Sequence, residues 1–287
     1  MLYSEYINSA FKGIFIVMIP KEQPISRQQK FRQFAEQAGS LFSIGKAAEI
    51  LHSDRASTAK SLARWHHQGL IARVAPGLYA LIPADVTATN FTLEDTWQLI
   101  PQLFAPGYVG GWSATEYWDL TEQIFNTLMV FTTQLVPRKQ VKIGQQRFEL
   151  KHVNESHLFG LKPVWRGQEK VMISDMHRTI IDLFDDLQTG AGLLHATDCL
   201  RNYLKKPDAN LNILSEYAQK INNGALYKRL GFLLQKLIGD THLIVEMFHA
   251  KLTQGNSYLD PRQKKQVRLV SHWRLFVPIA FEFEKEI

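Results

Sequence analysis

The pattern of hydrophobic and polar residues in the first part of the chain predicts three consecutive helices. Apolar residues recur at helical spacing in Arg27–Ala38, and Ser43 is a favourable N-cap for a second, short helix, Ile44–Leu51. A third helix extends from about Ala56 to His67 and stops just before a glycine. The residues expected to face inward on the first two helices are Phe31, Phe34, Ala35, Ala38, Ala47, Ala48 and Leu51.

The segment after the third helix has the pattern of a two-stranded hairpin. Gly69 is expected to end the helix, because glycine adopts the positive φ of a helix C-terminus without strain. An apolar pair at 70–71 then begins a strand, Ala75-Pro76-Gly77 forms a turn, and the apolar run Leu78–Ile82 returns. Helix, short turn, helix, glycine and hairpin in this order predict a winged helix-turn-helix over residues 21–84. Such a module binds either DNA or another protein.

The third helix is the expected recognition helix. On a helical wheel, Ala59, Leu62, Ala63 and His66 lie within an arc of about 100° and are expected to pack inward, with Trp65 at the edge. The opposite arc carries hydroxyls, an amide and two cations but no acid, which suits contacts with guanine edges or phosphates in a major groove. Arg64 is a candidate for a bidentate contact with guanine, and Tyr79 is expected to brace the wing. The expected DNA-binding residues are Ser57, Thr58, Lys60, Ser61, Arg64, Gln68, Arg73 and Gly77.

The remainder of the chain predicts a larger mixed α/β domain with a helical C-terminal part, which makes the fold class α+β. Residues 83–92 are small, polar and aperiodic, which indicates a link to a second domain at 85–287. Expected strands are Tyr108–Val109, Thr127–Gln134, Gln140–Ile143, Gln146–Val153 and Val171–Ile173, with a hairpin turn at Gly144-Gln145. Expected helices are Leu93–Phe104, one opened by Ser113, Asp175–Leu187, Leu193–Leu204, Asn212–Asn222 and Ala225–Ile238.

The distribution of charge supports a nucleic-acid partner. The net charge is +6, and residues 21–84 contain nine Lys and Arg against four acids, so nearly all of the excess lies in the winged helix. A concentrated basic domain is typical of proteins that contact phosphates. A second basic stretch at 262–274 is either a solvated face or a contact to flanking DNA or to an RNA. Its cations are Arg262, Lys264, Lys265, Arg268 and Arg274.

Cysteine content and hydropathy limit the cellular compartments in which the protein is expected. The single cysteine, Cys199, excludes an internal disulfide and a cysteine metal cage. The apolar run within residues 11–20 is too short to span a bilayer, which needs about 20 residues, so we expect a cytoplasmic protein without a membrane partner. Residues 1–20 are expected to form an N-terminal extension, and Met18 is an alternative start.

Candidate catalytic residues are few, and neither an enzyme, a cofactor nor a metal site is predicted. Asp175, His177 and Asp182 share one expected helix, and a second expected helix carries His195 and Asp198, without paired ligand spacing. The first aspartate is expected to cap its helix, and Arg178 with Asp182 forms an i,i+4 pair or a buried polar contact. Gly110-Gly111 permits a tight strand-to-helix turn. The stretch 282–285 faintly resembles a nuclease carboxylate–lysine strand, but no upstream aspartate is placed to join it.

Several blocks spread over most of the chain resemble the AbiEi antitoxin family of bacterial type IV toxin–antitoxin systems. They are FSIGKAAEIL, APGLYAL, YVGGWSATEYWDLTEQ (108–123), RTIIDL (178–183), GALYKRLGFLLQKL (224–237), SYLDP (257–261) and HWRL (272–275). His177 departs from the acid expected before RTIID in this family, so the role of that acid is in doubt here.

The resemblance implies a two-part function. The winged helix would bind inverted repeats in double-stranded promoter DNA and repress its own operon, and the larger domain would oppose a nucleotidyltransferase toxin without a stable complex. Two alternatives remain. The larger domain is an enzyme that acts on nucleic acid or nucleotide and is targeted by the winged helix, or it is a module that binds the toxin directly. The oligomeric state is open.

Overall fold

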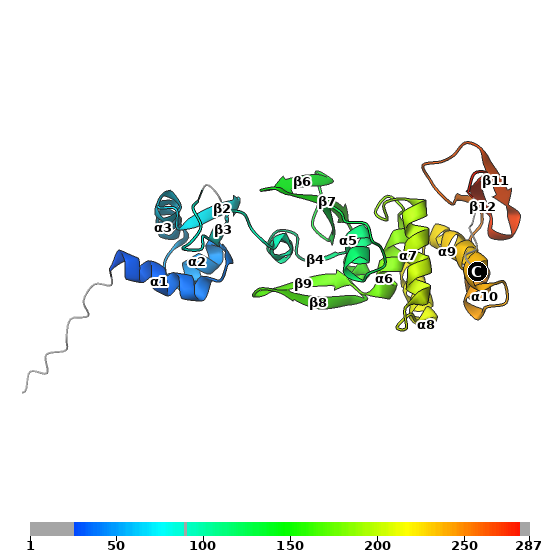
Figure 1. Ribbon diagram of the computed structural model, residues 1–287, viewed down its shortest axis with the longest axis horizontal. Coiled ribbons are helices and arrows are strands. Elements are labelled where there is room, and N and C mark those ends of the chain that lie inside the picture. The colour runs from blue at the N-terminus through cyan, green and yellow to red at the C-terminus, as the bar shows by residue number, and fades with distance from the viewer. Residues whose placement is uncertain (1–25, 89–90, 282–287) are drawn as a thin grey trace, which may run out of the picture.

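The computed structural model describes residues 26–88 and 91–281, apart from the side chain of Arg27. The predicted extension at 1–20 and the stretch 282–285 lie outside these residues. The described part is elongated, and four units follow one another along its longest axis (Figure 1). They are a small helical unit with a sheet, a larger sheet, a group of helices, and a small C-terminal sheet.

The first unit has the architecture of a winged helix-turn-helix. Three helices, α1 (Arg27–Ala38), α2 (Ile44–Ile50) and α3 (Arg55–His67), pack beside the strands β1 (Leu41–Ser43), β2 (Ile71–Ala75) and β3 (Leu78–Leu81). The strand order is β1-β3-β2, and both pairs are antiparallel. The three predicted helices and the hairpin are confirmed to within one or two residues. Strand β1 was not predicted, because three residues are too few to display a period.

The winged unit contacts the next unit through apolar side chains and a hydrogen bond. The 3₁₀ helix η1 (Thr96–Gln98) and the helix α4 (Leu99–Leu103) follow the link. Leu41, Leu78 and Ala80 of the wing sheet belong to the same buried cluster as Leu99 and Ile100. The hydroxyl of Ser40 also donates to Oε1 of Gln98 at 3.0 Å. A shared core therefore joins the two units across the link.

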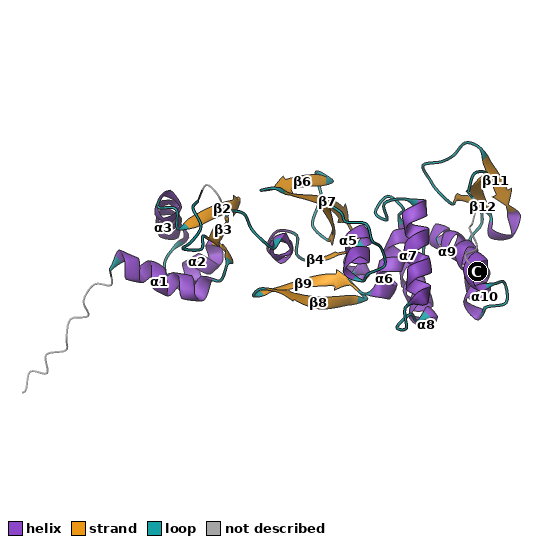
Figure 2. Ribbon diagram, in the orientation of Figure 1, coloured by secondary structure: helices purple, strands orange, loops and turns teal. Residues whose placement is uncertain are grey.

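The second unit is a six-stranded mixed sheet. Its order is β6-β7-β5-β4-β9-β8, and two antiparallel hairpins, β6–β7 and β8–β9, form its edges. The predicted strands and the turn at 144–145 are confirmed, whereas β8 was not predicted (Figure 2). The strands are β4 (Gly107–Val109), β5 (Thr127–Thr132), β6 (Gln140–Ile143), β7 (Gln146–His152), β8 (Leu161–Arg166) and β9 (Glu169–Ser174), with the 3₁₀ helix η2 (Glu155–His157) after β7.

The turn from β4 into α5 (Gly111–Tyr117) corrects one prediction. Ser113 does not open the helix, which begins at Gly111; its hydroxyl instead accepts a hydrogen bond from the backbone N–H of Met129 at 2.8 Å. Gly111 has a φ of 54°, and a Cβ there would collide with the carbonyl of Thr189. The prediction that glycine permits this tight turn is confirmed.

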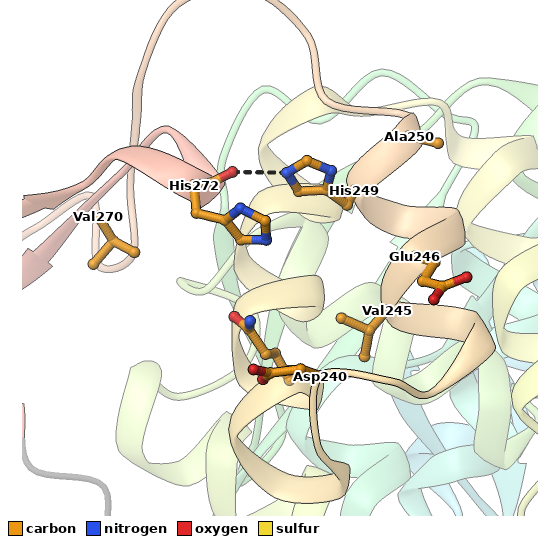
Figure 3. A pocket seen from close by; sticks show the side chains of 8 residues that line it. Asp240, Val245, Glu246, His249, Ala250, Val270 and His272 are labelled. Carbon is orange, nitrogen blue, oxygen red and sulfur yellow. Dashed lines mark hydrogen bonds between the residues drawn. The ribbon is translucent and has the colours of Figure 1, made fainter.

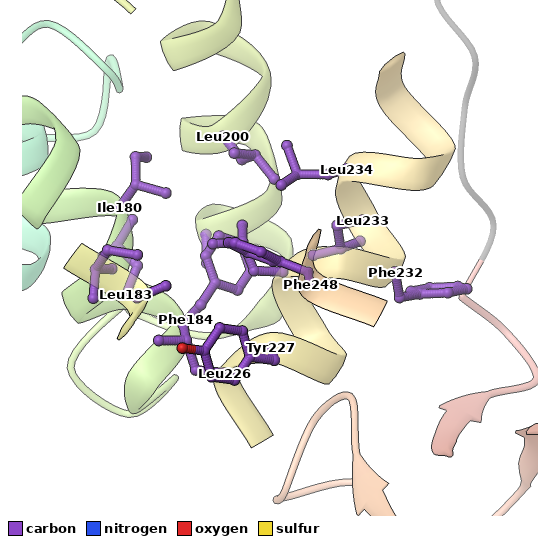
Figure 4. Packing of buried hydrophobic residues seen from close by; sticks show 14 of the residues in the cluster. Ile180, Leu183, Phe184, Leu200, Leu226, Tyr227, Phe232, Leu233, Leu234 and Phe248 are labelled. Carbon is purple, nitrogen blue, oxygen red and sulfur yellow. The ribbon is translucent and has the colours of Figure 1, made fainter. Parts of the chain in front are cut away.

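The third and fourth units share the largest buried cluster. The helices are α6 (Met176–Asp185), α7 (Leu193–Lys205), α8 (Leu211–Ile221), α9 (Gly224–Ile238) and α10 (Leu243–Ala250). Their apolar faces meet around side chains such as Phe184, Leu200, Leu226 and Phe248 (Figure 4). The C-terminal strands β10 (Ser257–Tyr258), β11 (Val267–Val270) and β12 (Leu275–Pro278), with the 3₁₀ helix η3 (Ser271–Trp273), add Trp273 to this cluster. Helix α10 was not predicted.

Candidate nucleic-acid interface

Helix α3 is fixed at its N-terminus by a capping residue. Oδ1 of Asp54 accepts hydrogen bonds from the backbone N–H groups of Ala56 and Ser57, at 2.9 and 3.0 Å. Hydrogen bonds from Ser57 hold the pKa of this carboxyl below its usual value. The carboxylate therefore satisfies two amides that a helix start leaves unpaired, and the helix itself contains no acid.

The inward face of α3 differs from the predicted face. Thr58, Leu62 and Trp65 are buried, and the Trp65 ring packs between Phe31 and Phe34 of α1, with ring centroids 5.1 and 4.8 Å away. Ala59, Ala63 and His66, which were expected to pack inward, are exposed. The large ring of Trp65 determines which face is buried, because it removes far more apolar area from water than a pair of alanines. The helical wheel therefore predicted the wrong centre for the buried face of α3.

Thr58 is a second correction. Its side chain is fully buried, and its hydroxyl lies 2.8 Å from that of Ser53. A buried side chain cannot contact DNA in this conformation, so the prediction that Thr58 is a contact residue is wrong.

The outward face of α3 carries most of the remaining predicted residues. Ser57, Lys60, Arg64 and Gln68 are exposed, and Ser61 is half-buried on the flank. His67 and Arg55 are also exposed, although neither was predicted as a contact. His67 lies seven residues after Lys60, on the same side of the helix, and this spacing could have identified it.

The C-terminus of α3 leads directly into the wing. The backbone N–H of Leu70 donates to the carbonyl of Trp65 at 3.0 Å, and the backbone N–H of Gly69 donates to the carbonyl of His66 at 3.0 Å. With a φ of 71° at Gly69, these two bonds form a Schellman motif, so the predicted role of this glycine is confirmed.

The wing places one predicted cation on the surface. Arg73 of β2 is exposed, and Gly77 is half-buried at the turn, where its φ is 75°. Tyr79 stacks on Phe42 with ring centroids 6.1 Å apart, so it braces the wing as predicted. Arg73 also borders a hollow of about 910 Å³ between the wing and the turn at Gly144 and Gln145.

A smaller hollow of about 420 Å³ lies between α1 and α3. Its polar lining residues are Gln28 and Arg32 from α1, Arg64 from α3, and Gln68, the C-cap of α3. Phe31, Trp65 and Leu70 complete it, and no acidic residue lines it. Gln28 and Arg32 were not identified from the sequence, although both lie beside the aromatic residues that position α1 against α3.

The candidate catalytic residues at the start of α6 and on it have structural partners, which include Tyr108 of β4 in the six-stranded sheet. Oδ1 of Asp175 accepts from the backbone N–H of Arg178 at 2.8 Å, which confirms the predicted cap. Nε of Arg178 lies 2.9 Å from Oδ1 of Asp182, and both side chains are nearly fully buried. The Tyr108 hydroxyl accepts from Nη2 of Arg178 at 3.1 Å and donates to Asp182, so hydrogen bonds link all three side chains. Nη1 of Arg178 is buried without a hydrogen-bond partner among the described residues. Burial raises the pKa of the Tyr108 hydroxyl well above its usual value.

The candidate histidines also have structural partners. Nδ1 of His177 lies 2.9 Å from the hydroxyl of Tyr203, and Nδ1 of His195 lies 2.9 Å from the carbonyl of Gly190. Burial lowers the pKa of both imidazoles and raises that of the adjacent Cys199 thiol to about 12. Asp198 is exposed and pairs with Arg201 at 3.1 Å. Across the described residues, no group of three or more His, Cys, Asp or Glu could hold a metal ion.

A hollow of about 640 Å³ lies far from the winged helix, between α9, α10 and the C-terminal strands (Figure 3). The rings of His249 and His272 stack inside it with centroids 4.1 Å apart. Nε2 of His249 lies 3.0 Å from the carbonyl of His272, and Asp240 and Glu246 line the same hollow. Two carboxylates and no Lys or Arg line this hollow, which does not suit a polyanion.

The second basic stretch lies at the C-terminal sheet, at the opposite end of the molecule from α3 (Figure 1). Arg262 pairs with Asp260 at 3.3 Å, Lys264 lies over the ring of Tyr258, and Arg274 donates to the carbonyl of Thr253. Lys265 and Arg268 are exposed.

None of the described helices is long and apolar enough to cross a membrane.

Comparisons with known proteins agree with the winged helix. Residues 29–82 match the model of a family described as "Transcriptional regulator, AbiEi antitoxin", so the resemblance is confirmed over this segment. The fold is similar to the crystal structure of the RV2827C protein from Mycobacterium tuberculosis, with a TM-score of 0.56 and 11% identity over 83% of this chain and 86% of that chain. No curated protein matches the sequence.

Proposed function

We propose that the protein is a sequence-specific DNA-binding regulator that represses its own toxin–antitoxin operon from the cytoplasm. The observation that carries the proposal is the acid-free outward face of α3, on which Ser57, Lys60 and Arg64 are exposed beside the wing. In a winged helix such a face enters the major groove, where cations reach base edges and phosphates. The match of residues 29–82 to a transcriptional-regulator family supports the same assignment.

The proposed contact set is the predicted set without Thr58. Ser57 and Lys60 face the groove, and Ser61 lies half-buried on the flank of α3. Arg64 and Gln68 lie on the flank toward α1, and Arg73 and Gly77 contact the backbone from the wing. The operator is proposed to contain inverted repeats, since regulators commonly bind two half-sites about one helical turn apart.

The second part of the proposal concerns the rest of the chain. From the resemblance to AbiEi antitoxins, we propose that residues 85–287 provide an activity that opposes a nucleotidyltransferase toxin without a stable complex. Isolation of the co-expressed pair separates the possibilities. A toxin that co-purifies at equal stoichiometry would favour direct binding, and turnover of nucleic acid by the regulator alone would favour an enzyme.

The DNA-binding proposal is tested by alanine substitution on the recognition helix. Lys60→Ala is expected to weaken operator binding by about 1–3 kcal/mol while the protein still unfolds cooperatively, because one charged contact is lost. Arg268→Ala, an exposed cation at the far end of the molecule, is the matched control and is expected to leave affinity unchanged. Equal affinities for Lys60→Ala and Arg268→Ala in gel-shift titrations would refute the assignment of α3.

A further inference from the structure

Two arginines from different helices line the same hollow beside the recognition helix. The edge-to-face contact of Phe31 with Trp65 sets the spacing of α1 and α3. Arg32 directly follows the first ring in the sequence, and Arg64 directly precedes the second. Both arginines, like these two rings, line the hollow of about 420 Å³.

The polar groups of the hollow form two similar pairs. Gln28 lies four residues before Arg32 on α1, and Gln68, the C-cap of α3, lies four residues after Arg64. Each helix with its cap therefore contributes one amide and one guanidinium from one side. All four residues are exposed. Among the described residues, neither arginine forms an ion pair with a carboxylate, and the hollow has no acid in its lining.

Two guanidinium groups that line one hollow, without an acid in its lining, favour an anion between them. Guanidinium forks match the oxygens of a phosphate, to which they donate charge-assisted hydrogen bonds, and the amides supply further donors. Trp65 is almost fully buried, so its ring is not available for stacking with a base, and Phe31 is half-buried with its ring against that of Trp65. The chemistry of the hollow therefore suits a phosphate rather than a nucleobase.

The position of Arg64 on α3 agrees with this ligand. The buried residues Thr58 and Trp65 place Arg64 and Gln68 on the flank that faces α1, whereas Lys60 and His67 occupy the middle of the outward face. A helix that enters a major groove reads bases with the middle of its outward face, and its flanks run along the DNA backbone.

We propose that the hollow between α1 and α3 is a phosphate clamp, in which Arg32 and Arg64 together bind one phosphodiester of the operator, assisted by Gln28 and Gln68. This inference rests on the proposed DNA-binding function and changes the role of Arg64 from a base contact to a backbone contact. It also assigns α1, which no sequence pattern had connected with DNA, to the interface.

The test compares Arg32→Gln and Arg64→Gln with Lys30→Gln, an exposed cation on α1 that does not line the hollow. Operator affinity is measured by titration between 50 and 200 mM salt on the operator and on a panel of its single-base variants. All variants are first required to show the cooperative melting of the wild type. The salt range follows from the steep dependence of phosphate contacts on ionic strength.

The clamp predicts that Arg32→Gln and Arg64→Gln each weaken binding on the order of tenfold on every sequence of the panel. Each substitution reduces the slope of log K against log salt by about 0.9, as expected for one phosphate contact. The double variant is expected to lose less than the product of the two single losses, because both arginines bind the same group. Lys30→Gln is expected to change neither slope nor affinity beyond about twofold.

Three results would overturn the clamp while leaving the proposed function intact. They are relaxed specificity at a single base pair in Arg64→Gln, an Arg32→Gln protein that equals Lys30→Gln, and full additivity of the two losses. Titration with inorganic phosphate in the absence of DNA tests whether the hollow binds a free phosphate ion instead of a phosphodiester of the operator. Phosphate binding that is lost in Arg32→Gln, with unchanged salt slopes on DNA, would identify free phosphate as the ligand. Absence of specific binding by the wild type would refute the proposed function and the clamp together.

Discussion

The hydroxyl of Thr58 is an interior group of the winged helix, within 2.8 Å of Oγ of Ser53. Both residues lie near the start of α3, so this bond ties the helix to the turn that precedes it. Thr58→Val is expected to reduce the free energy of unfolding by about 1 kcal/mol, since one buried hydrogen bond is lost without a change in volume. Operator affinity is expected to remain that of the wild type. Chemical denaturation and gel shift measure the two quantities, and a large loss of affinity at unchanged stability would contradict the buried role.

His195 makes the stability of the protein depend on pH. Burial lowers the pKa of its imidazole, while the unfolded chain titrates near the ordinary value of about 6.5. Below that value the unfolded state binds a proton that the folded state resists, so the free energy of unfolding decreases as the pH falls from about 7 to 5. His195→Gln is expected to show a smaller decrease in Tm over this range, although its Tm at pH 7 is itself lower.

The comparison isolates one residue because the other titrating groups are common to both proteins. Burial also lowers the pKa of His157 and His177, which therefore act with the same sign in the wild type and in the variant. Parallel curves of Tm against pH for the two proteins would show that His195 does not contribute.

At the scale of elements, the orientation of α3 depends on both of its ends. The Schellman motif at Gly69 directs the chain from the helix into β2, with a φ that an alanine adopts only under strain. Gly69→Ala is expected to reduce stability by about 1 kcal/mol or more. The matched control is Gly45→Ala inside α2, where φ is not positive and a Cβ would meet only ordinary contacts. This control is expected to increase stability by roughly 0.5–1 kcal/mol. Equal effects in thermal melts would contradict this account.

The elements that have a clear hydrophobic period, a helix-capping residue or a turn residue could be predicted from the sequence, and the other elements could not. The cap at Ser43, the glycine at 69 and the hairpin turn at 144–145 each use a local backbone preference that is visible in a short window. Strand β1 has three residues, and β8 alternates only weakly. Helix α10 reads LIVEMFHA, in which apolar residues occur on almost every side, so its period is hidden.

The candidate interface was predictable in composition but not in orientation. The absence of acids from α3 can be read directly, and it identified Ser57, Lys60 and Arg64. Which face of α3 packs inward depends on Trp65 meeting Phe31 and Phe34 of α1, a contact between residues about thirty positions apart. The same contact forms the hollow with Arg32, so neither the burial of Thr58 nor the role of α1 could be found from a single-helix pattern.

At the scale of the whole molecule, the winged helix and the six-stranded sheet share a buried cluster. Leu99 of α4 is 1% exposed and packs in the cluster that contains Leu41 and Leu78 of the wing sheet. Leu99→Ala is expected to reduce the free energy of unfolding by about 2–5 kcal/mol. It should also speed hydrogen exchange in β1 and β3 as well as in the sheet of the second unit. Faster exchange confined to the second unit would mean that the two units are independent.

The proposed function requires that this chain recognise a specific DNA sequence through its winged helix. The most direct measurement is a gel-shift titration of the full chain on the DNA upstream of its own gene, with an unrelated duplex of equal length at the same salt. We expect binding to the upstream DNA that is tighter on the order of a thousandfold or more, with protection of inverted repeats. Equal and weak binding to both duplexes would contradict it and leave only a basic surface.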